Sequence, residues 1–216
     1  MSPKIKLEDE KEETKAIKFK SFIAFALLFA SINLKPRIEF NEIIPSYYIY
    51  FSSVILLFIL ITCSVNDIKY LNITNKICIF GYTTGLIITG IKGLYLSSNI
   101  AIWLIKDHFL ASIYALFLMN TISLVGSKIY RKNALGIGDA KFSCMGGAWI
   151  GSSGILLALG IAFISAGIFA LILKKYRRKW SREFFAFCPF ISLGIWIVWL
   201  FESLFVMKQL KLIWGI

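Results

Sequence analysis

The sequence predicts an all-α, polytopic membrane protein with a six-helix core and one additional helix near the N-terminus. Three observations predict this class. Of the 216 residues, 58% are hydrophobic, and the mean hydropathy of +0.74 exceeds that expected of a soluble domain. The apolar residues form runs of about the length that a helix needs to cross a bilayer. Most basic residues lie between these runs, where membrane proteins use them to fix orientation.

Six apolar runs follow one another along the chain, at about 21–34, 47–65, 76–91, 109–126, 142–173 and 184–207. The first is short for a span, since about 20 helical residues are needed. The fifth is too long for one helix, and we expect it to form two helices joined by a tight turn near Gly151-Ser152-Ser153-Gly154. The sequence therefore has seven candidate spans.

The same runs divide the chain into three parts. Residues 1–20 carry mixed charges and few apolar side chains, so they are expected to form a solvated cytoplasmic tail. Residues 21–46 would form the additional N-terminal span and an outer loop. Residues 47–216 would form the main membrane domain.

The distribution of basic residues predicts the orientation. If the N-terminus is cytoplasmic, the inner segments 1–20, 66–76, 127–141 and 174–183 hold 18 of the 24 lysines and arginines. Cytoplasmic loops of membrane proteins carry such an excess. The net charge of +12 is therefore attributed to topology and to contact with anionic lipid, and nucleic-acid binding is not expected.

Neither a metal nor a cofactor is predicted. The chain has four cysteines: Cys63, Cys78, Cys144 and Cys188. None forms a C-x-x-C pair of the kind that holds structural zinc, so each is expected to be a small hydrophobic residue. The single histidine, His108, follows Asp107 on the predicted outer side, where we expect a surface or interfacial pair.

Two aspartates adjoin the ends of apolar runs: Asp67, within Asn66-Asp67-Ile68, and Asp139, within Gly136-Ile137-Gly138-Asp139. An ionisable residue near membrane depth is costly, so a functional role is the default hypothesis. The predicted topology puts both on the cytoplasmic side. Two neighbouring carboxylates can share one proton, the ionised one activating water and the protonated one donating to a carbonyl. The aspartates are therefore candidates for peptide hydrolysis if their helices pack side by side.

Glycines flank the second aspartate. Gly136 and Gly138 have no side chain, so the backbone can turn sharply and an extended substrate can approach closely. The same Gly-x-Gly string can instead break a loop before a helix.

Three stretches resemble, in the same order, the motifs of the type IV prepilin peptidase family. They are Asp67-Ile68 with Ile73-Thr74-Asn75, Gly136-Ile137-Gly138-Asp139-Ala140-Lys141-Phe142 with Gly146-Gly147-Ala148-Trp149-Ile150-Gly151, and Phe187-Cys188-Pro189-Phe190-Ile191-Ser192-Leu193-Gly194. The resemblance covers residues from about 47 to 206. There are two departures: Thr74 stands where the family usually has proline, and Phe187 and Cys188 replace residues of the C-terminal segment.

The resemblance implies that Asp67 and Asp139 are the catalytic pair of an aspartic endopeptidase. It implies an active site at the cytoplasmic face of the inner membrane. The substrate would be a prepilin-like or preflagellin-like precursor whose short basic leader is removed. Larger family members carry paired C-x-x-C motifs associated with N-methylation, which this chain lacks, so it resembles the short, cleavage-only form.

Two further residues could support the site. Lys141 could act on Asp139 through its charge or anchor the helix at the membrane surface, and Asn75 could orient the loop after Asp67 or serve as a turn residue. Two alternative functions remain open at the level of sequence. One is a presenilin-like intramembrane protease, which shares Gly-x-Gly-Asp. The other is a small proton- or cation-coupled transporter or an assembly scaffold. The oligomeric state is not predicted.

Overall fold

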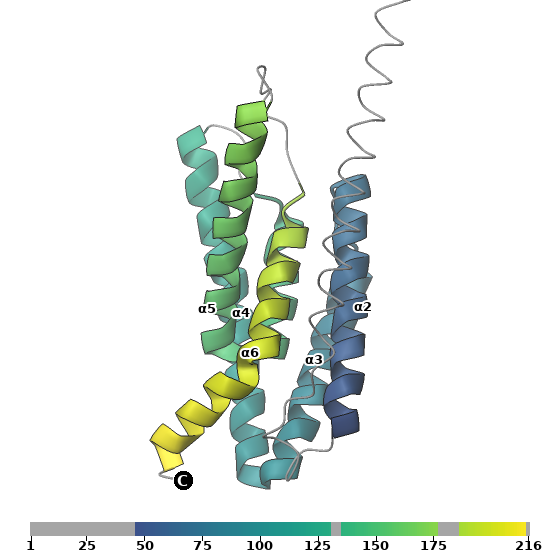
Figure 1. Ribbon diagram of the computed structural model, residues 1–216, viewed down its shortest axis with the longest axis vertical. Coiled ribbons are helices and arrows are strands. Elements are labelled where there is room, and N and C mark those ends of the chain that lie inside the picture. Colours follow the sequence, from purple (N-terminus) through teal and green to yellow (C-terminus); the bar gives the residue numbers. More distant parts are fainter. Residues whose placement is uncertain (1–45, 131–134, 177–185, 215–216) are drawn as a thin grey trace, which may run out of the picture. The chain divides into compact units, whose positions relative to one another are not determined.

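The computed structural model describes residues 46–130, 135–176 and 186–214. This part of the chain forms five helices and no strand, as Figure 1 shows. They are α2 (Ser46–Tyr70), α3 (Asn75–Leu96), α4 (Ser98–Tyr130), α5 (Ile137–Tyr176) and α6 (Cys188–Trp214). The all-α prediction is confirmed. The predicted tail and the run at 21–34 lie outside the described residues.

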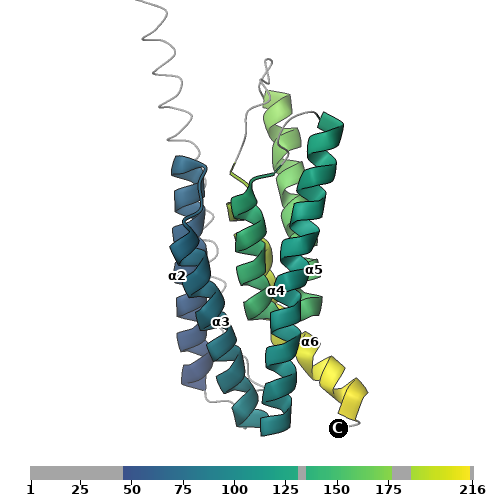
Figure 2. The same cartoon turned by 180° about the vertical axis from the view of Figure 1, so that it is seen from behind.

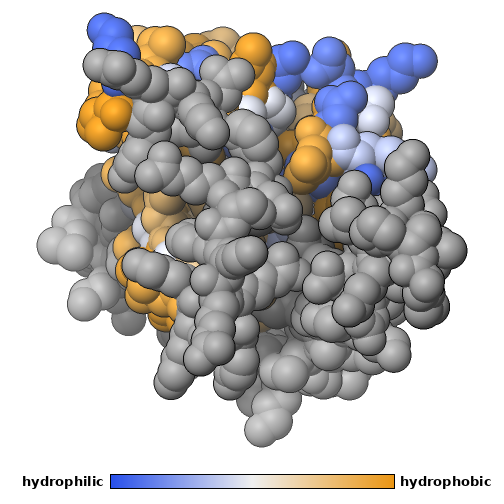
Figure 3. Space-filling model, turned by 90° about the horizontal axis from the view of Figure 1, so that it is seen from above, coloured by the Kyte–Doolittle hydropathy of each residue, from blue (hydrophilic) through white to orange (hydrophobic). Residues whose placement is uncertain are grey.

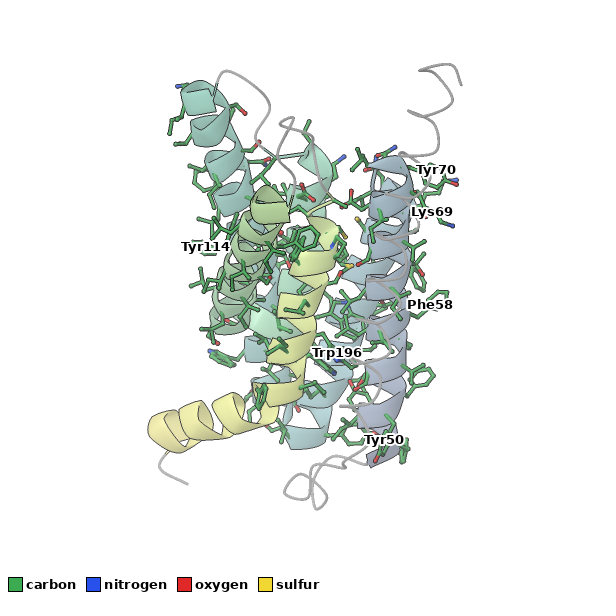
Figure 4. All side chains as sticks on the ribbon, turned by 45° about the horizontal axis from the view of Figure 1, so that its top comes forward. Tyr50, Phe58, Lys69, Tyr70, Tyr114 and Trp196 are labelled. Atoms are coloured by element: carbon green, nitrogen blue, oxygen red, sulfur yellow. The ribbon has the colours of Figure 1, made fainter. Side chains whose placement is uncertain are left out.

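Four of these helices, α2 to α5, are long and apolar enough to cross a membrane. Their outward faces carry large apolar side chains, and in Figure 4 Tyr50, Phe58 and Tyr70 point away from the bundle. Many hydroxyl groups donate to a carbonyl three or four residues earlier in the same helix, as Thr62 does to Phe58 at 2.7 Å. This pairing satisfies polar groups where lipid offers no partner. The helices are therefore suited to a bilayer.

The helices pack as an antiparallel bundle. Helix α2 packs against α6 and α3, α4 packs against α3 and α5, and α5 also packs against α3 and α6. Figures 1 and 2 show that α2 and α4 end at the same end of this bundle, where α3, α5 and α6 begin. Both aspartates lie next to helix connections at that end. The antiparallel arrangement thereby brings these parts of the chain together.

Helix α5 is broken at Gly151, which has φ 70° and ψ −177°. This backbone conformation is essentially restricted to glycine. The chain reverses there, so that the residues before and after Gly151 form two antiparallel helical segments (Figures 1 and 2). The predicted turn near Gly151-Ser152-Ser153-Gly154 is confirmed, and six helical segments cross the described bundle.

Asp107 of α4 caps the segment that follows this break. Its carboxylate accepts a hydrogen bond from the Ser152 backbone N–H at 3.1 Å and one from the Ser152 hydroxyl at 2.6 Å. His108 is only 3% exposed, and its Nδ1 lies 3.0 Å from the Ala148 carbonyl oxygen. The expected surface or interfacial pair is therefore wrong for His108, because its ring is buried against α5.

The start of α4 also differs from the prediction. The apolar run predicted in this part of the sequence begins at about residue 109, after Lys106, Asp107 and His108. Helix α4 instead begins at Ser98, and only Ser97 separates it from the end of α3 at Leu96. The polar residues are accommodated in a helix because Lys106 is exposed and Asp107 has partners on α5.

A close approach of α4 and α5 forms much of the core. A Cβ on Gly147 would lie 2.8 Å from the backbone of Ala111, so only glycine permits this spacing. Two residues further along, Trp149 is 1% exposed, and its Nε1 donates to the Gly81 carbonyl of α3 at 2.8 Å. The first segment of α5 is thus held between α3 and α4, which fixes the position of its N-terminal end.

Candidate active site

Asp67 lies inside α2, three residues before the helix ends at Tyr70. Its side chain is 6% exposed. Oδ2 accepts a hydrogen bond from the Cys188 backbone N–H at 3.0 Å. The Phe187 backbone amide interacts with the same carboxylate. The start of α6 therefore faces Asp67, with the Cys188 amide hydrogen-bonded to it.

The connection after α2 turns the chain back into α3 within four residues. Leu71 takes a left-handed conformation, with φ 50°. Ile73 is buried, and Thr74 is the N-cap of α3 with φ −68° and ψ 121°. The Thr74 carbonyl accepts from the Ile77 N–H at 3.1 Å. This short connection places Ile73 against the start of α5.

Asp139 lies in the first turn of α5 and is 8% exposed. Its backbone N–H donates to the Gly136 carbonyl at 3.1 Å, and its Oδ2 accepts from the Gly136 N–H at 3.2 Å. This reciprocal contact is the acidic half of a capping box, with the carboxylate at the positive end of the helix. Local helix-capping therefore fixes the orientation of the Asp139 side chain.

The fold brings the two aspartates together. Their carboxylates interact electrostatically although they lie 72 positions apart in the sequence, at residues 67 and 139. Ile73 packs on Gly138, and the Lys141 ammonium donates to the Asn75 side-chain oxygen at 2.9 Å. These contacts join the α2–α3 connection to the first turn of α5. The ends of α2 and α5 are thus linked through the α2–α3 connection, whereas α2 packs along its length against α3 and α6 and not against α5, so the side-by-side packing of the two aspartate-bearing helices is not found among the described residues.

The two candidate glycines differ in what they contribute. A Cβ on Gly138 would lie 3.3 Å from Ile73, so glycine permits this close packing. A Cβ on Gly136 would meet the Asp139 carboxylate at 3.5 Å and the Gly138 nitrogen at 3.9 Å, both ordinary distances, and the φ of Gly136 is not positive. Gly136 acts here through its backbone N–H, so the space that the sequence analysis expected from both glycines is needed only at Gly138.

Sequence reasoning did not indicate that Cys63 and Cys188 lie close to the aspartates, with Cys78 and Cys144 next to them. The Cys188 thiol interacts electrostatically with Asp67, Asp139 and Cys78, and Cys63 contacts Cys78. Cys144 also interacts with Cys78. All four are free thiols, and the described residues hold no cluster able to bind a metal ion. Their wide spacing in the sequence gave no signal of this cluster, which lines the inner side of the site with soft, weakly polar groups.

Seen from the end that holds the aspartates, hydrophilic and apolar side chains alternate among the placed residues (Figure 3). The exposed lysines on the helix ends described here are Lys69, Lys76, Lys128 and Lys141. Such a border of basic residues is typical of the cytoplasmic surface of a membrane protein.

A family model for type IV leader peptidases matches residues 54–171, which is more than half of the chain. The chain belongs to the type IV leader peptidase family. It is therefore a peptidase, and its four long apolar helices make it a membrane protein. No curated protein and no solved structure matches it.

The matched residues include both aspartates of the candidate site and the loop with Ile73 and Thr74. They end within α5, before the segment of residues 187–194 that resembles the C-terminal family motif. The contact of that segment with Asp67 is therefore known from the tertiary structure alone.

Proposed function

We propose that this type IV leader peptidase is an aspartic endopeptidase whose catalytic groups are Asp67 and Asp139. One ionised carboxylate would take a proton from the attacking water while the other, protonated, donates to the scissile carbonyl oxygen. The observation that carries the proposal is that two buried carboxylates from different helices lie near enough to interact electrostatically. Burying two carboxylates in a membrane protein costs free energy, so their presence indicates a functional role.

The surroundings of the pair support hydrolysis of a chain at the membrane surface. Asp67 and Asp139 lie at helix ends, next to an end of the bundle bordered by lysines. A substrate with a polar leader and an apolar helix could place the boundary between these parts at that depth. We therefore propose, as substrates, prepilin-like or preflagellin-like precursors cut at the cytoplasmic face of the inner membrane, with membrane lipid around the helices.

The test uses purified full-length protein in detergent or nanodiscs and a precursor that has a basic leader, a glycine and an apolar helix. Asp67→Asn and Asp139→Asn are each expected to lower kcat by about 10²–10⁴-fold, because each removes an acid–base group. The double variant should be little worse than either single one, because the two groups act as a unit. Leader release is followed by mass spectrometry.

Asp107→Asn is the matched control, because it makes the same change at the α5 break and keeps an oxygen that can accept from Ser152. It should keep the cleavage rate of the unmodified protein. Full cleavage by either Asp67→Asn or Asp139→Asn would contradict the proposed pair. Uptake of a solute without any cleavage would favour a transporter.

A further inference from the structure

The first turn of α6 approaches Asp67 with its backbone. Phe187 is the N-cap, since its carbonyl accepts from the N–H groups of Phe190 at 3.0 Å and Ile191 at 3.3 Å. Cys188 is then the first helical residue, and its N–H has no acceptor within its own helix. That N–H donates to the Asp67 carboxylate. A carboxylate at this position also lies at the positive end of the α6 dipole.

Further contacts hold α6 in register with α2. The Ser64 and Ser192 hydroxyl oxygens lie 2.8 Å apart in the buried interface, one helical turn from Asp67 and from Cys188. Towards the other end of the bundle, the Trp199 Nε1 donates to the Ser53 hydroxyl at 3.0 Å. These contacts join two antiparallel helices at successive points along their length. The hydrogen bond from Cys188 to Asp67 lies at the end of this series, so the packing of the whole helices fixes its position.

Aromatic packing fixes the N-cap from the other side. The Phe187 ring is 6% exposed and lies 5.1 Å from the Phe163 ring of α5, measured between centroids. Phe190 lies 5.4 Å from Phe169 of the same helix. The second segment of α5 thus supports the turn of α6 that faces Asp67. The backbone amides there are pre-positioned before any substrate arrives.

We propose that the first turn of α6, capped by Phe187, is a positioning element of the proposed peptidase, in which the backbone amide of Cys188 holds the Asp67 carboxylate towards Asp139. This inference rests on the proposed function for its catalytic consequence. Phe187 and Cys188 act through Asp67 and are positioning residues. The contact itself is a property of the fold and can be measured without any substrate.

A contact made by the backbone is compatible with the different side chain that this chain has in the C-terminal motif that it resembles. A backbone N–H is present at every residue except proline, so different side chains can make the same contact. Cys188 replaces a family residue, yet its N–H still reaches Asp67. What this position requires is a donor on the backbone and a side chain that fits in a buried space.

The contact is tested directly by NMR of full-length protein labelled with ¹⁵N-cysteine. The chain has four cysteines, so four amide resonances are expected, and Cys188→Ala identifies one of them by its loss. A charge-assisted hydrogen bond shifts an amide proton downfield. In Asp67→Asn, the Cys188 amide proton should therefore move upfield, and further than those of the other three cysteines. An unmoved Cys188 resonance would overturn the proposal.

The consequence for catalysis is tested with Cys188→Pro, which removes the donor. Proline is tolerated at the first position of a helix, where the N–H has no partner within the helix. We expect kcat to fall about 10- to 100-fold, because the reacting group is misplaced, while KM changes less than about twofold. Cys188→Ala keeps the N–H and should recover kcat to within about threefold of the unmodified protein.

Ser98→Pro is the matched control, because Ser98 is the first residue of α4 at the opposite end of the bundle. The preceding Ser97 is extended, with φ −175° and ψ 159°, as a residue before proline prefers. This variant should keep both kcat and KM. Equal losses in Cys188→Pro and Cys188→Ala would assign the effect to the side chain and overturn the proposal.

The two proposals fail in different ways. If the unmodified protein cuts no precursor, the proposed function is refuted, and the NMR shift still decides whether α6 holds Asp67. If the protein cuts precursors but the chemical shift of the Cys188 amide proton does not change in Asp67→Asn, only the positioning role is refuted. If Cys188→Pro does not fold, the NMR comparison in Asp67→Asn remains decisive.

Discussion

At the N-cap of α3, Thr74 has φ −68°, close to the value of about −65° that a proline ring imposes. This is the position where the resembling family usually has proline. The threonine thus keeps the backbone conformation of the connection between Asp67 and α3. Threonine in place of proline at this position therefore leaves the local backbone conformation unchanged.

Thr74→Pro is therefore expected to stabilise the protein by about 0.4–1 kcal/mol, because proline restricts the unfolded chain and fits the folded one. The measurement is the apparent Tm in detergent, which should rise. A lower Tm would mean that the Thr74 N–H, which proline lacks, has a required acceptor.

At the scale of the element, the break in α5 depends on one glycine and on its neighbour in α4. Gly151 adopts a conformation that other residues rarely reach, and a Cβ there would lie 2.7 Å from the Asp107 carboxylate. The carboxylate must stay in place to cap the segment that begins at Ser152. The turn at Gly151, the cap by Asp107 and the reversal of the chain therefore depend on one another.

Gly151→Ala should destabilise the protein by about 1–3 kcal/mol, because it combines backbone strain with this steric conflict. The loss would appear as a lower apparent Tm in detergent. Gly160→Ala is the control: it lies in the same helix, and its added Cβ would meet nothing within 4 Å. It should leave the Tm unchanged or raise it slightly, because alanine favours a helix over glycine. Equal effects of the two changes would contradict a special role for the turn.

At the scale of the whole molecule, the bundle has two distinct ends. The end with Asp67 and Asp139 carries Lys69, Lys76 and Lys141, whereas Ser97 connects α3 to α4, which begins at Ser98, at the other end. The excess of basic residues predicts that the first end is cytoplasmic.

We expect a membrane-impermeant maleimide to label Ser98→Cys, and not Lys76→Cys, in intact cells. Inverted membrane vesicles should give the opposite result, because both positions are exposed at their own end of the bundle. The unmodified protein is the blank, since three of its four cysteines are buried. Labelling of both positions from the same side would contradict the topology.

The sequence by itself determined the class and the approximate spans of the described helices, and it singled out two aspartates as the candidate catalytic pair. Long apolar runs must be helical in lipid, because their backbone groups have no other partners, so this part of the fold follows from local composition. The turn at Gly151 was likewise evident from a cluster of glycines in a run too long for one helix.

Only the tertiary structure decided which groups surround those aspartates. The start of α4 at Ser98, the burial of His108 and the position of Cys188 beside the aspartates all depend on partners that are distant in sequence. The amide of Cys188 donates to Asp67, which lies 121 positions earlier in the sequence. A backbone N–H is present at almost every residue, so no pattern of side chains could have predicted this contact. Helix formation is specified by neighbours along the chain, whereas a site built between helices is specified by how they pack.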